Sequence, residues 1–233
     1  MTIASEPDPA TGLPVGPPVD AAPAKWPERV TLKGRFGRVE PLSLQHVGAL
    51  WRSVERRAEL WPYVSAGPFL NERSFSDWIR FRIEAKDSAS YAILDTAASP
   101  CGVAALMEIR PAMRACEVGS IVYTPALQRT PLGTEAQYLL ARYAFETLRY
   151  RRYEWKCNAL NAPSRRAALR YGFSYEGILR AHMVIKGRNR DTAYFSMIES
   201  EWPSRKAAFE AWLSPDNFDR AGRQKRRLEE LRT

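Results

Sequence analysis

The chain has 233 residues, of which 45% are hydrophobic and 26% charged, which suits one core rather than two. Its net charge of +9 should attract phosphates, acidic protein tails or nucleic acid, without choosing among them. The sequence has no long uncharged apolar run, so it offers no candidate for a transmembrane helix.

Residues 1–28 are rich in proline and lack a periodic apolar pattern, so we expect a disordered or loosely packed arm. This segment has neither a positively charged leader nor the apolar core of a signal peptide. We therefore expect a cytoplasmic protein that does not bind a membrane.

Cysteine and histidine usage indicates neither disulfides nor metal. Cys101, Cys116 and Cys157 lie in apolar or alternating runs without CxxC spacing, which is typical of buried reduced thiols. With only His46 and His182 present, a metal site would need clustered carboxylates, and no cluster is visible. We expect no metal cofactor.

Two helices are predicted before the main strands. From residue 30, apolar and polar residues alternate, which predicts an edge hairpin or bent strand. A helix is predicted over residues 43–60, with Ser43 as its N-cap, and a second starts near Ser74. The apolar face of the second helix would contain Phe75, Trp78, Ile79 and Ile83.

Three extended runs then predict an antiparallel meander, and helices and strands alternate after it. The predicted strands of the meander are residues 90–95, 101–110 and 115–124. After the meander we expect a long amphipathic helix (134–150) and a buried strand (153–160). A helix capped by Ser164 and stopped by Gly172 follows, and then two strands around a turn at residues 186–189. Residues 203–233 are expected to form a helical basic tail, whose charges are Arg220, Arg223, Lys225, Arg226 and Arg227.

The stretch LQRTPLGTEA, residues 127–136, connects the third strand of the meander to the long helix. The loop amides and the first N–H groups of the helix can point at one anion, which makes this junction a candidate pyrophosphate site. The local pattern alone is weak, because an ordinary strand–turn–helix connection also leaves free amides.

The element order and three local sequences resemble the GCN5-related N-acetyltransferases (GNAT), and within them the RimJ/RimL-like ribosomal-protein acetyltransferases. The resemblance covers residues 30–200 and places the acetyltransferase domain at 29–202. It implies an α/β (α+β) fold, a mixed but mostly antiparallel sheet of about seven strands flanked by about four helices, with the fourth and fifth strands splayed.

In the family, a loop written Q-x-x-G-x-G/A holds the pyrophosphate of coenzyme A. Gln128 matches its first position and Gly133 its second small position, whereas Pro131 replaces the first glycine and Arg129 stands where relatives often have glycine. These changes remove easy access to positive φ and one amide donor. We expect Pro131 to begin the helix and Arg129 to contact phosphate, the alternative being an exposed loop arginine.

The second local sequence is NAPSRRAALRYGF, in which Asn161 and Ser164 match positions that face the cofactor. Ala168 stands where many relatives have a tyrosine that protonates the leaving thiolate, so Ser164 is the candidate acid, with a helix N-cap as its alternative role. The resemblance thus implies cofactor contacts from Val122, Tyr123, Gln128, Arg129, Thr130, Leu132, Gly133, Thr134, Asn161, Ser164 and Arg166. The third sequence, IKGRNRDTAYFSMI, supports the family, with Asp191 as a turn carboxylate.

The family's reaction transfers acetyl from acetyl-CoA directly to an amine in a ternary complex. Glu117 is the candidate base, because a carboxylate buried between apolar residues has a raised pKa. Its alternative role is a solvent-facing or arginine-paired carboxylate, and Glu108 is a weaker candidate. A strand amide near Val122 or Tyr123 would stabilise charge on the carbonyl oxygen.

The resemblance places acceptor recognition in the first two helices and the last hairpin. Trp61, Tyr63 and Phe69 could form an apolar wall, or simply pack in a core. His182 is a further candidate for substrate contact, or a histidine satisfied by its neighbours.

The resemblance implies an N-acetyltransferase acting on a protein N-terminal amine or a small-molecule amine, as a monomer or homodimer. One alternative is a noncatalytic acyl-CoA-binding or regulatory domain, suggested by the missing glycines and tyrosine. Another is a nucleic-acid-binding module suggested by the charge, but no recognition motif accompanies that charge.

Overall fold

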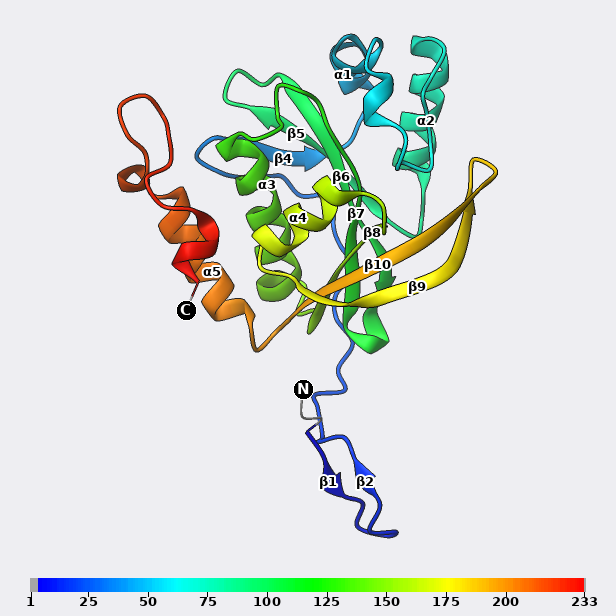
Figure 1. Ribbon diagram of the computed structural model, residues 1–233, viewed down its shortest axis with the longest axis vertical. Helices are drawn as coiled ribbons and strands as arrows, with labels where there is room; N and C mark the ends of the chain where they lie inside the picture. The colour runs from blue at the N-terminus through cyan, green and yellow to red at the C-terminus, as the bar shows by residue number, and fades with distance from the viewer. Residues whose placement is uncertain (1–3, 233) are drawn as a thin grey trace.

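One eight-stranded sheet organises the chain in the computed structural model, which describes residues 4–232 (Figure 1). Its strand order is β3-β4-β5-β6-β7-β8-β10-β9, and all neighbours are antiparallel except β7 and β8. The strands are β3 (Leu32–Lys33), β4 (Gly37–Pro41), β5 (Ala89–Asp95), β6 (Pro100–Arg110), β7 (Ala115–Tyr123), β8 (Arg152–Asn158), β9 (Ser174–Ile185) and β10 (Arg188–Ile198). The predicted mixed, mostly antiparallel sheet is confirmed.

Five α-helices cover the two faces of this sheet. They are α1 (Val47–Val54), α2 (Glu72–Glu84), α3 (Pro131–Arg142), α4 (Ala162–Arg170) and α5 (Trp202–Leu213). The helix predicted over 43–60 is shorter, with single 3-10 turns on both sides of α1. In the described part of the chain, no helix has the length and hydrophobicity needed to cross a membrane.

Side-chain alternation along the strands divides the interior into two cores. On β5, Tyr91 and Ile93 belong to the larger core, which also contains residues of α3 and α5. Ala92 and Leu94 point the other way and pack with residues of α1 and α2. The site described below lies where the strands between these two cores separate.

The C-terminal segment differs from the predicted basic helix. After α5 the chain forms a loop closed by a bridge between Phe218 and Gln224. Asp219 Oδ1 accepts hydrogen bonds from the amides of Ala221 and Arg223, both at 2.9 Å, and this local turn competes with helix formation. Leu228 is 1% exposed within the larger core, so the segment folds back onto the domain.

The N-terminal segment forms a ribbon of β1 (Glu6–Pro7) and β2 (Pro14–Val15) that projects from the body (Figure 1). Ala24 is buried, and the Lys25 amide donates to the Leu148 carbonyl at 2.9 Å. The chain therefore contacts the domain before residue 29, where a disordered or loosely packed arm is expected. The domain boundaries themselves stay a prediction.

Helix α3 is joined to the β3–β4 hairpin through a buried carboxylate. The Glu135 side chain accepts hydrogen bonds from the amides of Arg35 at 2.6 Å and Phe36 at 2.8 Å. These amides would otherwise lack partners beneath the helix, where an unsatisfied donor is costly. Glu135 thus fixes the position of the helix whose N-terminus forms part of the site.

Replacing Glu135 with alanine should lower the free energy of unfolding by about 2–4 kcal/mol, because two amides lose their acceptor. Urea unfolding measures the change, with an unchanged m-value expected for a fold that is otherwise retained. The matched control is Glu229→Ala, at an exposed carboxylate. Equal stability of the two variants would contradict the assignment.

Candidate active site

The site is centred on the separation of β7 and β8. These parallel strands pair at only three positions, Ala115 with Arg152, Cys116 with Tyr153, and Glu117 with Glu154. Beyond them, β7 continues to Tyr123 alongside β6, and β8 continues alongside β10. The predicted splay of these two strands is confirmed, and it opens a gap in the middle of the sheet.

A bulge in β7 accounts for the separation. Val122 pairs with Val103 and Gly119 pairs with Ala105, so three steps along β7 match two along β6. Ser120, inside this interval, has a φ of 49° in the left-handed region. An extra residue bends a strand and increases its twist, and here it directs the end of β7 away from β8.

Glu117 lies at the point where the two strands part. Its side chain is 8% exposed, and its Oε2 lies 3.1 Å from Lys156 Nζ. Burial raises the pKa of Glu117 to about 7, although the ammonium of Lys156 acts in the opposite direction. The carboxyl group is therefore buried as predicted, and a lysine takes the place of the arginine considered as its partner.

The carboxylate opposite Glu117 is held in its charged form. Burial alone would raise the pKa of Glu154, but hydrogen bonds from Arg110 and Arg152 lower it to about 2. The bonds measure 2.6 Å and 2.7 Å. Two neighbouring carboxyl groups thus have well-separated pKa values, and of the two only Glu117 can change its protonation state near neutral pH.

The loop from Thr124 to Thr130 is tied to the ends of two strands. Thr124 Oγ1 donates to the Cys101 carbonyl at 2.6 Å, and Gln128 Nε2 donates to the Tyr123 carbonyl at 2.9 Å. Thr130 is the N-cap of α3, and its Oγ1 accepts from the Gly133 amide at 3.2 Å. Pro131 is the first residue of α3, as predicted.

Arg129 keeps a backbone shape that glycine would adopt more easily. Its φ is 61°, in the left-handed region, which is unfavourable for a residue with a Cβ atom. Within the described part of the chain, the amides of Arg129 and Leu132 have no acceptor, so both are available to an anion. A Cβ on Gly133 would lie 2.9 Å from the Leu127 carbonyl oxygen, so this close approach requires glycine.

Several predicted cofactor residues have side chains that are buried or already hydrogen-bonded within the protein. The Thr134 hydroxyl accepts a hydrogen bond from Arg170 Nη1 at 3.0 Å. Leu132 and Val122 are buried in the two cores, and the amide side chain of Gln128 is bonded within the loop. The candidate seat for an anion therefore consists mainly of amides, with the exposed Arg129 side chain beside them.

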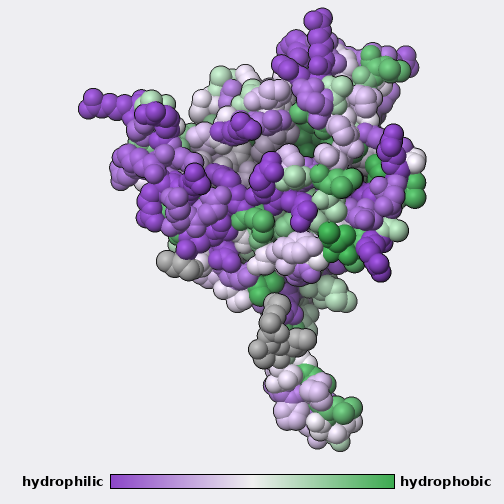
Figure 2. All heavy atoms as spheres, viewed as in Figure 1, coloured by the Kyte–Doolittle hydropathy of each residue, from purple (hydrophilic) through white to green (hydrophobic). Residues whose placement is uncertain are grey.

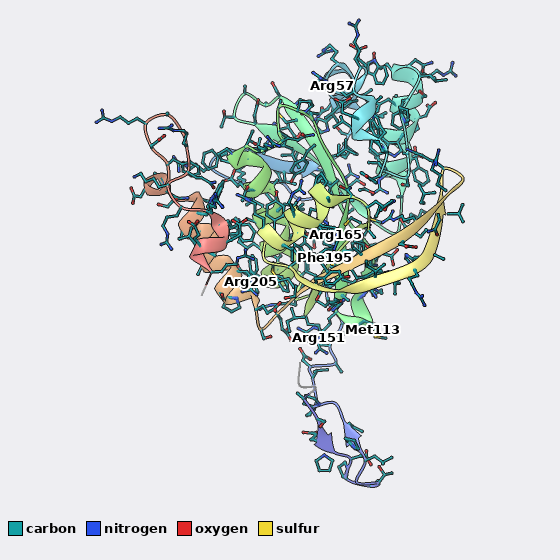
Figure 3. The ribbon with its side chains drawn as sticks, viewed as in Figure 1. Arg57, Met113, Arg151, Arg165, Phe195 and Arg205 are labelled. Carbon is teal, nitrogen blue, oxygen red and sulfur yellow. The ribbon has the colours of Figure 1, made fainter. Side chains whose placement is uncertain are left out.

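Helix α4 supplies the other side of the gap. Its N-cap is Asn161, whose Oδ1 accepts from the Ser164 amide at 3.1 Å, so the predicted N-cap role of Ser164 is wrong. Ser164 Oγ instead accepts from Trp155 Nε1 at 3.0 Å. Arg165, labelled in Figure 3, donates to the Ala159 carbonyl at 3.3 Å, while Arg166 is exposed.

Comparisons with known proteins agree with this geometry. Residues 38–174 match the family described as "Acetyltransferase (GNAT) domain". The chain belongs to this GNAT family. A GCN5-related N-acetyltransferase from Brucella melitensis is 45% identical over 90% of this chain and 97% of that one, with a TM-score of 0.87.

Two further relatives support the assignment. A probable GNAT-family acetyltransferase of known structure from Chromobacterium violaceum is 36% identical, covering 79% of this chain and all of that one, with a TM-score of 0.73. YdaF of Bacillus subtilis, named as a ribosomal N-acetyltransferase, is 25% identical over 72% of this chain and 92% of its own length. The resemblance to ribosomal-protein acetyltransferases is thereby confirmed.

In the segment after α1, where an apolar wall for the acceptor is predicted, Trp61 and Phe69 pack in the core. Trp61 is 2% exposed, and its ring contacts that of Phe69, with centroids 5.1 Å apart. Tyr63 is 40% exposed and remains available to a ligand. Lys186, which the sequence did not single out, donates from Nζ to the carbonyls of Trp61 at 2.8 Å and Ala66 at 2.9 Å.

The hairpin of β9 and β10 therefore contacts the loop that follows α1. His182 is exposed on β9, and its Nδ1 lies 3.0 Å from Thr192 Oγ1. On the face that this hairpin crosses, hydrophobic residues form separate green patches among polar ones in Figure 2; the exposed ones on β9 are Tyr175, Ile178, Leu179, Met183 and Val184. Among the described residues, no group of three or more metal-binding side chains occurs.

Substitutions at Arg129 separate its charge from its backbone conformation. Arg129→Ala and Arg129→Gly should both weaken coenzyme A binding about tenfold, because each removes a charge-assisted contact. Only Arg129→Gly should also raise the free energy of unfolding, by about 1 kcal/mol, since glycine accepts a positive φ. Calorimetry and urea unfolding measure the two effects, and an unchanged affinity in both variants would remove Arg129 from the site.

Proposed function

We propose that this GNAT protein transfers an acetyl group from acetyl-CoA to a primary amine, by direct attack within a ternary complex. The observation that carries the proposal is the position of Glu117, a buried carboxyl group with a pKa of about 7 at the edge of the β7–β8 gap. A base with that pKa accepts a proton near neutral pH.

The amide-lined seat before α3 would bind the pyrophosphate of the donor. Its support is the pair of unbonded amides at Arg129 and Leu132, directed by the N-terminus of α3, where the helix dipole favours an anion. Chain segments on both sides of the gap then flank the thioester, with β7 on one side and α4 on the other.

In the reaction, the amine nitrogen bonds to the thioester carbonyl carbon and its proton passes to Glu117, directly or through a water molecule. The carbonyl oxygen gains negative charge, which an amide of β7 near Val122 or Tyr123 would stabilise. The carbon–sulfur bond then breaks, and the thiolate takes up a proton.

Ser164 is the proposed donor of that last proton. Its Oγ accepts from the Trp155 indole, so its hydroxyl proton points at another acceptor. That acceptor is the Cys157 sulfur without substrate and would be the leaving thiolate during the reaction. The same hydroxyl also bonds with the Cys157 thiol, so its alternative role is to hold α4 against β8.

The acceptor is proposed to be a protein N-terminal amine or a small-molecule amine. The similarity to YdaF, named as a ribosomal N-acetyltransferase, favours a ribosomal protein, and a cytoplasmic location goes with that acceptor. A thiol-release assay with acetyl-CoA against N-terminal peptides, polyamines and amino acids tests the proposal. Tight coenzyme A binding without turnover on any amine would instead indicate a noncatalytic acyl-CoA-binding domain.

Removing the proposed base should reduce turnover far more than donor affinity. Glu117→Gln should lower kcat by about 10²–10⁴-fold, the usual contribution of general base catalysis, with nearly unchanged binding of acetyl-CoA. Glu108→Gln is the control, because Glu108 is the nearby exposed carboxylate on β6. A Glu117→Gln enzyme with full activity would exclude this mechanism.

The pH profile provides a second check on Glu117. The base must be ionised to accept a proton, so kcat/KM should rise with pH and level off above its pKa of about 7. In the Lys156→Met variant the midpoint should move to higher pH, because the ammonium no longer stabilises the carboxylate. A midpoint that is the same in the wild type and in Lys156→Met would show that a group other than Glu117 sets the pH profile.

A further inference from the structure

A pocket of about 270 Å³, separate from the β7–β8 gap, lies where the C-terminal end of α2 meets the start of β5. Residues 26–29 and the last residue of β4 complete its walls. It is formed by segments other than the loop before α3, so neither the anion seat nor the family comparison accounts for it.

Three polar side-chain atoms in this pocket are buried without a hydrogen-bond partner in the described part of the chain. They are Arg82 Nη2, Ser88 Oγ and Ser90 Oγ, and all three residues line the pocket. Buried polar atoms are normally satisfied, because each unpaired one is costly. The guanidinium of Arg82 on α2 and the hydroxyl groups of Ser88 and Ser90 near the start of β5 thus have unused hydrogen-bond donors in the walls of one pocket.

The charges around these donors favour an anion. Arg29 and Lys86 are exposed at the pocket, and so is the side chain of Glu28. Burial lowers the pKa of Arg82, although Asp87 acts in the opposite direction. In the described part of the chain no ion pair joins Arg82 to a carboxylate, so its charge lacks a close counterion.

We propose that this pocket binds an anionic oxygen group, a carboxylate or a phosphate, through Arg82, Ser88 and Ser90. A guanidinium supplies directed donors that match the oxygens of either group, and a serine hydroxyl can donate to them as well. The ligand occupies the pocket with its charged group against the Arg82 guanidinium.

One of the pocket's donors, Ser90, lies on the same face of the sheet as Glu117, whereas Ala89 and Tyr91, which also line the pocket, point to the other face. Ser90 pairs with Ala105, which pairs with Gly119, two residues beyond Glu117. Directly paired residues and residues two apart share a face, and two strand spacings separate β5 from β7 by about 10 Å. An acceptor with an acidic group near its amine could therefore reach both places, an extension that rests on the proposed function.

The first experiment measures anion binding without any substrate. Thermal unfolding is followed with succinate or inorganic phosphate as the probe, at constant ionic strength, for the wild type, Arg82→Gln and Arg80→Gln. Coenzyme A is present at saturation in every sample, so that the anion seat before α3 is already filled. Arg80 is an exposed arginine on the same helix, so it controls for net charge. At a tenfold excess of probe over its dissociation constant, the wild type and Arg80→Gln should gain about 3 °C or more.

The Arg82→Gln protein should lose this gain. The double variant Ser88→Ala/Ser90→Ala keeps the charge and removes two donors, so its gain should fall by at least half, which tests the pocket even if Arg82→Gln folds poorly. Equal gains in the wild type and both pocket variants, or no gain in the wild type, would overturn the proposal.

The second experiment identifies the source of the anionic group. Acetylation of N-terminal peptides with glutamate or glutamine at the second position is compared by KM in the wild type and Arg82→Gln. A KM about tenfold lower for the acidic peptide, lost in Arg82→Gln, assigns the pocket to the acceptor. Equal KM values together with the thermal gain assign it to a free anion, whereas a failure to acetylate any peptide would count against the proposed function and leave the thermal result standing.

Discussion

The sheet is continuous only through the three residue pairs that join Ala115–Glu117 to Arg152–Glu154. This short parallel contact determines where the gap opens, because the bulge at Ser120 prevents β7 from following β8 any further. It also determines which side chains lie at the opening, since the last pair is formed by two glutamates. The loop before α3 then starts at the free end of β7, so the anion seat lies at the open side of the gap.

The last pair illustrates how one location can hold two carboxyl groups with different tasks. Both side chains are buried and both contact Lys156, but Glu154 also receives two arginine hydrogen bonds and keeps its charge. Hydrogen bonds to the charged form lower a pKa, and burial raises it. The surrounding cations thus stabilise the strand contact through Glu154 and leave Glu117 able to exchange a proton.

Much of this arrangement could be predicted from the sequence, because it depends on local patterns. The alternation of apolar and polar residues predicted the strands, and the apolar stripe predicted α3. The proline after Thr130 indicated where that helix begins. The burial of Glu117 followed from its apolar neighbours, but its partner Lys156 comes from a strand 39 positions later, and pairing register is not visible in one sequence. The same limit applies to Lys186 and to the cap of α4, where Asn161 and Ser164 both had suitable chemistry and only backbone geometry distinguishes them.

The contact made by Lys186 gives the gap a second fixed point. One half of the sheet, from β3 to β7, carries Glu117 and the loop before α3, and the other half, from β8 to β9, carries Lys156 and supports α4. The halves meet at the three strand pairs and again where the hairpin tip donates to the carbonyls of Trp61 and Ala66. The gap between the two halves is therefore held at two separate places, by the strand pairs at one end and by the Lys186 hydrogen bonds at the other. Both contacts together fix the distance between the halves.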